Sequence, residues 1–133
     1  MSLNEEERKA IVDLEMGKAE NSFAQIEKLA ELGYWDTIAN RLYYSAFHAA
    51  SALLIHDGHQ VNTHKGVIAI LGQHYVKTGI LCHEDGQLYS RLQTMRNNSD
   101  YNCSFDASED DIRPLIPYAS NFLNKIKVLI SGK

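Results

Sequence analysis

The sequence predicts an all-α fold, an antiparallel up-and-down bundle of four long helices plus one shorter helix. Three observations predict it. Apolar residues recur at three- and four-residue steps along most of the chain, no segment alternates as a strand does, and only two prolines interrupt the 133 residues. At this length, and with 44% hydrophobic residues, the chain fits one domain spanning residues 1–133 around a single core.

Residues 4–32 predict the first helix through apolar side chains at helical spacing, namely Ile11, Leu14, Ala19, Phe23, Ile26 and Ala30. Three glutamates at positions 5 to 7 suit a helix N-terminus, and Gly33 is expected to end the helix. A second helix is expected over residues 36–55. One of its faces is rich in small side chains that allow a close helix contact: Ala39, Leu42, Ala46, Ala50 and Leu53.

Thr63 is a suitable cap for a third helix, which Gly79 is expected to end. A fourth helix begins near Glu84 and is expected to end at about Met95, where the polar stretch "RNNSDYNC" begins. The last helix opens with "SEDD", which resembles a capping box, and carries two prolines soon afterwards. Its regular part therefore either begins near Arg113 or has kinked first turns.

Charge and composition exclude several classes of protein. The net charge is −4 and the chain has no basic stripe, so tight non-specific binding to nucleic acid is disfavoured, no DNA partner is expected, and only a local site can bind RNA. No apolar run approaches the ~18 residues of a membrane span, and the acidic start is unlike a signal peptide. The two cysteines lack the spacing of a disulfide framework or a zinc site. We therefore expect a cytoplasmic protein without a membrane partner.

The sequence gives no reason to expect a metal or another cofactor. None of the 17 acidic residues is followed three positions later by a histidine, which excludes the Glu-x-x-His pattern of di-iron bundles. His56, His59 and His64 lie close in sequence but lack a cysteine or a well-placed carboxylate to complete a tetrahedral site. We interpret them as a solvated turn, with His64 in the first turn of the third helix.

Arg96 is the strongest candidate for a binding residue. Its guanidinium is well shaped for two contacts to a phosphate, and Asn97, Asn98 and Asp100 are its polar neighbours. The alternative is structural, because a cation at a helix C-terminus is favourable by a few tenths to about 1 kcal/mol. His48 borders the alanine face of the second helix, where a packed, hydrogen-bonded histidine is more common than a catalytic one. These residues alone leave both interpretations of Arg96 open.

Three blocks of the sequence, "ANRLYYSAFHAASALL", "NTHKGVIAILGQHYVKTGIL" and "RLQTMRNNSDYN", resemble the HEPN domain family (higher eukaryotes and prokaryotes nucleotide-binding). The similarity spans residues 10 to about 130. It implies a helical up-and-down bundle that forms a homodimer, often encoded beside a minimal nucleotidyltransferase. Active members of the wider family are metal-independent endoribonucleases, in which both subunits contribute an arginine and a histidine that follows it by a few residues.

Arg96 matches the arginine of that motif, but its histidine is absent. Tyr101, Asn102 and Cys103 occupy the allowed places, and none of these side chains ordinarily titrates near neutral pH as imidazole does. The resemblance is therefore closest to the histidine-lacking branch of the family, and we expect no specific RNase activity. The ligand-binding residues that we predict are Arg96, Asn97, Asn98, Asp100, Tyr101 and His48.

The predicted function is a nucleotide- or RNA-binding module, a homodimer that works with a nucleotidyltransferase in a toxin–antitoxin-like or defence system. The alanine-rich second helix also favours a dimer. Two alternatives stay open. One is a metal-independent endoribonuclease that uses Arg96 with an unconventional partner, such as His48 or Tyr101. The other is a purely structural bundle in which Arg96 only stabilises a helix end.

Overall fold

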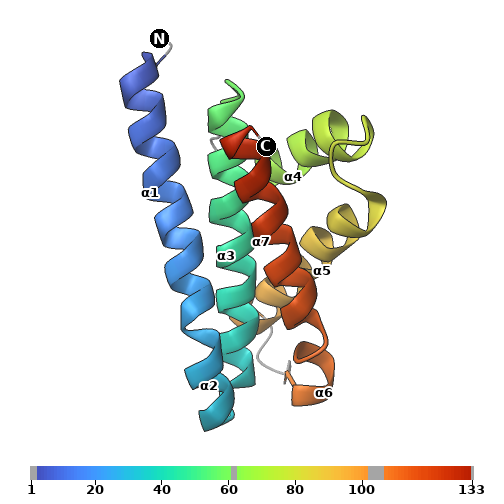
Figure 1. Ribbon diagram of the computed structural model, residues 1–133. Coiled ribbons are helices and arrows are strands. Elements are labelled where there is room, and N and C mark those ends of the chain that lie inside the picture. Colours follow the sequence, from blue (N-terminus) through green and yellow to red (C-terminus); the bar gives the residue numbers. More distant parts are fainter. Residues whose placement is uncertain (1–2, 61–62, 102–106, 133) are drawn as a thin grey trace.

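The computed structural model describes residues 3–60, 63–101 and 107–132, with residues 99–101 described by their backbone only. All regular structure in these ranges is helical, which confirms the predicted all-α class. The four long helices are α1 (Glu5–Ala24), α3 (Trp35–His56), α5 (His83–Tyr101) and α7 (Leu115–Ser131). They alternate in direction, as an up-and-down bundle requires (Figure 1).

The first predicted helix is divided in two. Asn4 and Glu7 form a capping box at the start of α1, in which the Asn4 Oδ1 accepts the Glu7 N–H at 2.8 Å and the Glu7 carboxylate accepts the Asn4 N–H at 3.0 Å. The helix stops at Ala24, and α2 (Ile26–Leu32) begins after Gln25. Gly33 ends α2 with a left-handed backbone, φ 75°, as predicted.

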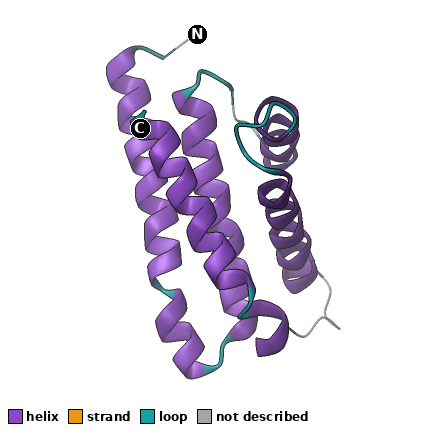
Figure 2. Ribbon diagram, turned by 45° about the vertical axis from the view of Figure 1, so that its right-hand side comes forward, coloured by secondary structure: helices purple, strands orange, loops and turns teal. Residues whose placement is uncertain are grey.

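Helix α3 is the centre of the bundle, since α1, α5 and α7 all pack against it. Figure 2 shows α4 and α5 one above the other beside the group formed by α1, α3 and α7. The small side chains of α3 are buried inside the single chain: Ala39, Ala46, Ala49, Ala50 and Ala52. The Ser45 hydroxyl also donates to the carbonyl of Ala19 on α1 at 2.9 Å. The alanine face is therefore used for packing within one chain, so it gives no reason to expect a dimer.

The third predicted helix begins as expected and then changes its winding. Thr63 caps α4 (His64–Ile70) by accepting the Gly66 N–H on its hydroxyl at 2.9 Å. The chain continues without interruption into a π-helical stretch, η1 (Leu71–Val76). Gly79 follows with φ 87° and ends the helical run, as predicted.

Helix α5 is longer than the sequence pattern predicts. It continues to Tyr101, so Arg96 lies inside the helix and the interpretation of Arg96 as a cation at a helix end is wrong. The stretch between Arg96 and Tyr101 contains neither glycine nor proline, and so nothing in it forces the helix to stop. Apolar residues stop recurring at helical spacing in this stretch because it is more polar, although the helix continues through it. Asn102 and Cys103 lie outside the described residues.

The chain returns through a short helix, α6 (Glu109–Ile112), and then through α7. Ser108 caps α6 by accepting the Asp111 N–H at 3.3 Å, as the "SEDD" pattern predicts. Pro114 precedes the first residue of α7, where a proline costs no helical hydrogen bond. This arrangement matches the expectation that the regular helix begins near Arg113. No helix among the described residues is long and apolar enough to cross a membrane.

Candidate functional site

The Arg96 side chain lies across two aromatic rings of α3. Its Nη2 donates to the Tyr44 hydroxyl at 3.0 Å, and its Cζ is 5.7 Å from the centre of the Tyr43 ring and 5.6 Å from the centre of the Tyr44 ring. These distances are typical of cation–π contacts. The Nη1 donates to the Asn97 side-chain oxygen at 3.1 Å. The guanidinium of α5 is thus oriented by residues that precede it in the sequence by about fifty positions.

Adjacent tyrosines on α3 supply this surface because their side chains leave the helix in different directions. Tyr43 is buried in the core, whereas Tyr44 is only half-buried and reaches the surface. Phe47, one turn after Tyr43, lies parallel to it with ring centres 5.9 Å apart. Burial raises the pKa of the Tyr43 phenol above its ordinary value, so this hydroxyl stays protonated at neutral pH.

His64 joins the same cluster from α4. Its Nδ1 is 2.5 Å from the Tyr43 hydroxyl oxygen, and its ring stacks on Phe47 with the ring centres 4.2 Å apart. Partial burial lowers the pKa of His64, and electrostatic interactions with Arg96 and His48 lower it further. The imidazole is therefore mainly neutral at pH 7. His64 is the first residue of α4, as predicted, but its ring packs against aromatic side chains, so the expectation of a solvated environment is wrong for this histidine.

A signal for His64 was present in the sequence. Thr63 fixes His64 as the first residue of the helix, and Val67 and Leu71 follow it at i+3 and i+7. Both of these apolar residues are buried. A histidine on the same face as two core residues points inward, so the helical spacing could have separated His64 from the other two histidines of the turn.

His48 lies at the edge of this cluster and is held by α1. Its Nδ1 is 2.6 Å from Glu15 Oε2, and both side chains are mostly buried. The His48 ring centre is 6.1 Å from that of Tyr44 and 5.3 Å from that of Phe47. His48 is thus packed and hydrogen-bonded, and it stands one aromatic ring away from Arg96.

The structure describes the other predicted binding residues less completely than Arg96 and His48. Asn97 is exposed and bound to Arg96, and Asn98 is half-buried. The side chains of Asp100 and Tyr101 lie outside the described residues, although the backbone of both belongs to α5. The roles assigned to these four residues stay predictions.

The remaining histidines of the turn do not converge with His64. His56 pairs with the neighbouring carboxylate of Asp57 at 2.9 Å, while the His59 ring lies 5.0 Å from that of His74. In the part of the chain that the structure describes, no three or more histidine, cysteine or acidic side chains are grouped so that they could hold a metal ion. The site around Arg96 is instead a cation, a neutral imidazole and two phenols.

This combination can hold a phosphate and move a proton. A guanidinium binds phosphate oxygens well, aromatic rings can stack on a base, and a neutral imidazole can accept a proton near neutral pH.

Known proteins are similar to this chain over two thirds of its length or more. A family model of the HEPN domain matches residues 13–129. The chain is 36% identical to a UPF0332 protein of Thermotoga maritima over 68% of this chain and 69% of that protein. It is 30% identical to a UPF0332 protein of Archaeoglobus fulgidus over 87% of this chain and 92% of that protein. It is also 28% identical to a Methanocaldococcus jannaschii protein named "Putative toxin MJ0142", over 87% and 79% of the two chains.

Proposed function

Because the chain belongs to the HEPN domain family, we propose that it is a nucleotide- or RNA-binding module of a toxin–antitoxin-like or defence system. A relative that this chain matches over most of its length carries the word toxin in its name, which supports a toxin-like role. The proposal also names two partners. One is a second copy of the chain, and the other is a minimal nucleotidyltransferase.

The observation that carries the proposal is the position of Arg96 over Tyr43 and Tyr44. A guanidinium that is already oriented loses less conformational freedom when it binds a phosphate. The neighbouring aromatic surface offers a place where a base can stack, which is how many proteins hold single-stranded nucleic acid. The net charge of −4 is consistent with one local contact of this kind and not with an extended phosphate-binding surface.

The predicted neighbours of Arg96 complete the proposed site. Asn97 and Asn98 supply amide groups beside the phosphate, and His48 flanks the aromatic surface. Asp100 and Tyr101 follow on the same helix. In a homodimer that places the two copies of this helix at a shared cleft, the two Arg96 guanidiniums would meet at one phosphate. Two cations at close range repel each other, so an anion between them would stabilise the dimer.

Thermal denaturation tests the binding site. Nucleotides, short RNA oligomers and sulfate are added in turn to the wild type, to Arg96→Ala and to Arg96→Lys. A ligand at a hundred times its Kd should stabilise the wild type by about 2.7 kcal/mol, and the effect should shrink with added salt. Arg96→Lys should restore little of it, because lysine lacks the two-pronged geometry.

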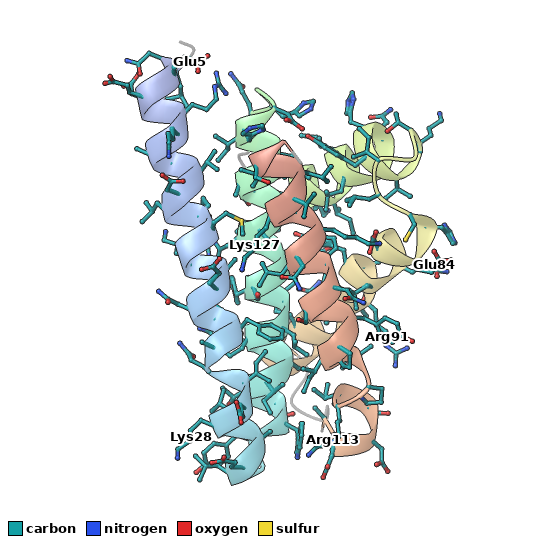
Figure 3. The ribbon with its side chains drawn as sticks, viewed as in Figure 1. Glu5, Lys28, Glu84, Arg91, Arg113 and Lys127 are labelled. Atoms are coloured by element: carbon teal, nitrogen blue, oxygen red, sulfur yellow. The ribbon has the colours of Figure 1, made fainter. Side chains whose placement is uncertain are left out.

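Arg91→Ala is the matched control for this experiment. Arg91 lies on the same helix but is exposed, and its side chain points outward at the edge of the bundle (Figure 3). It should keep the response of the wild type. If no anion raises the melting temperature of the wild type, or if Arg91→Ala loses the response as fully as Arg96→Ala does, the proposed site is wrong.

The two proposed partners have separate tests. Light scattering at tens of micromolar protein should give the mass of two chains, and the mass of one chain would remove the shared cleft. For the second partner, a nucleotidyltransferase encoded in a neighbouring reading frame should co-purify with this chain. A pair that stays separate on a sizing column would remove that part of the proposal.

A further inference from the structure

A groove, here called the α2–α7 groove, lies between α2 and the start of α7, at the end of the molecule where α6 also lies (Figure 1, Figure 2). Phe23, Ala24 and Ala30 line one wall, and Ile116 lines the other. Phe23, Ala30 and Ile116 are half-buried against the core, so each keeps part of its apolar surface open to solvent. The volume of about 560 Å³ lies within the range of known ligand-binding clefts.

The arrangement of the helices explains why the groove is open. Helix α2 and helix α7 both pack against α3. Two helices that lie on the same third helix leave a furrow between them, and the side chains of a further helix can pack into such a furrow. The shape of the groove therefore suits a helix better than a flat surface.

The α2 wall of the groove carries negative charge. Glu27 and Glu31 line it, and both are exposed. Lys28 approaches Glu31 only to 3.6 Å, and both of those side chains are mostly exposed, so this pair is weak. In the part of the chain that the structure describes, the Glu27 carboxylate has no ion-pair partner. The charge of Glu27 is thus available to a cation from outside the chain.

The cation on the opposite wall, Arg113, is already engaged. Its Nε donates to the Glu109 carboxylate at 2.6 Å, and its Cζ lies 5.0 Å from the centre of the Trp35 ring. Residues 25–36 and 107–118 together hold six acidic and two basic side chains, so their net charge of −4 equals that of the whole chain. The excess negative charge of the protein is therefore concentrated around this groove.

We propose that the α2–α7 groove binds a basic amphipathic helix of a protein partner. The apolar face of that helix packs on Phe23, Ala30 and Ile116, which is a common way for proteins to recognise a helical segment. Its lysines or arginines reach Glu27 and Glu31 on the wall. The same carboxylates repel phosphate groups, so neither nucleic acid nor an anionic lipid surface fits here. The groove shares no residue with the cluster around Arg96, and the inference does not depend on the proposed function.

The test is the binding of a designed peptide to the full chain, measured by fluorescence anisotropy. The peptide is short, carries fluorescein, and has leucines on one face of a helix and lysines on the other. It should bind with one peptide per chain, and added salt should weaken the binding, because exposed charges are screened beyond ~8 Å at 0.15 M salt. A peptide with glutamates in place of the lysines should bind at least about tenfold more weakly.

Two variants with matched controls locate the peptide. Ala24→Arg places a bulky cation in the groove at an exposed position and should abolish binding. Ala10→Arg makes the same change at an exposed position of the same helix, outside the groove, and should bind as the wild type does. Reversing both wall charges, as Glu27→Lys with Glu31→Lys, should weaken binding by about tenfold or more.

The control for the reversed charges is Glu5→Lys with Glu6→Lys. It makes the same change of net charge, but Glu5 lies at the opposite end of the molecule from Arg113, and this variant should keep most of the affinity (Figure 3). An equal loss in the two double variants would mean that net charge alone attracts the peptide, and the inference would be wrong.

Three other outcomes also overturn the inference. They are no binding of the basic peptide to the wild type, equal binding of the acidic peptide, and full binding to Ala24→Arg. Light scattering on the protein alone tests a different occupant. If Ala24→Arg lowers the mass of the assembly while Ala10→Arg does not, a second copy of the chain fills the groove instead of a basic partner.

Discussion

The Tyr43 hydroxyl oxygen and the Nδ1 of His64 lie 2.5 Å apart and join α3 to the first residue of α4. Tyr43 is buried, so this hydrogen bond forms at the boundary between the core and the surface. The same tyrosine carries the Arg96 guanidinium on the face of its ring. One core residue thus positions both a cation and an imidazole. A substitution of Arg96 should therefore alter the pKa of His64.

The first prediction concerns the titration of His64. Partial burial and then the charge of Arg96 hold the pKa of His64 below its ordinary value of about 6.5. Arg96→Ala removes a nearby positive charge that disfavours the imidazolium, so the pKa of His64 should rise. NMR titration of the histidine ring protons measures this. The pKa of His64 should stay unchanged in Arg91→Ala, and an equal shift in both variants would show that the two side chains do not interact specifically.

The second prediction compares two helix caps of the same kind. Thr63→Ala and Ser108→Ala each remove a hydroxyl that accepts a backbone N–H, so each should lower the free energy of unfolding by about 1 kcal/mol. Only Thr63→Ala should also weaken the stabilisation by RNA, because Thr63 positions the turn that carries His64. Denaturant unfolding with and without RNA measures both effects. A loss of the RNA effect in Ser108→Ala would mean that the response follows general stability.

Much of the fold could be predicted because each long helix carries its own apolar period. The breaks inside the predicted helices could not be predicted from the sequence. Gln25 has a good helix propensity, yet α1 ends before it, which local propensity does not indicate. The end of α5 was predicted too early because the stretch after Met95 loses its apolar repeat. An exposed polar segment can remain helical without such a repeat.

The candidate site was predicted only in part. Arg96 was identified because its side-chain chemistry is distinctive and its surroundings in the sequence are polar. His64 was missed, since its partner Tyr43 lies 21 residues away and the crossing of two helices decides which residues meet. Sequence spacing shows which face of a helix is buried. The spacing does not show which face of another helix packs against that buried face.

The third prediction tests the close packing of α3 inside the chain. Ala49→Leu adds volume at a position that is fully buried, so it should lower the free energy of unfolding by about 1–3 kcal/mol or more. Ala69→Leu makes the same change at an exposed position of α4 and should alter stability by less than about 0.5 kcal/mol. Urea unfolding measures both. If Ala49→Leu has as little effect as Ala69→Leu, the alanine face is not packed inside the chain.

The last prediction concerns the buried carboxylate of Asp85, which links α5 to α7. Lys125 donates to its Oδ2 at 2.8 Å, and the backbone N–H of Cys82 donates to the same oxygen at 3.1 Å. Burial alone would raise the pKa of Asp85, but the hydrogen bonds from Lys125 and Cys82 outweigh it and lower the pKa below its ordinary value. The charged form is therefore the one that the fold stabilises.

The sign of the pH dependence follows from that direction. A carboxyl group with a depressed pKa in the folded state contributes fully above its unfolded pKa, about 3.9, and loses the contribution as the pH falls through the folded value. Asp85→Asn should therefore cost about 1.5–3 kcal/mol at pH 7, and the difference from the wild type should shrink below about pH 4. Urea unfolding at several pH values measures it. Glu20→Gln removes only an exposed pair with Lys127 and should cost less than about 1 kcal/mol. A cost for Asp85→Asn that is equal at pH 7 and at about pH 3 would mean that packing, and not the charge, makes Asp85 important.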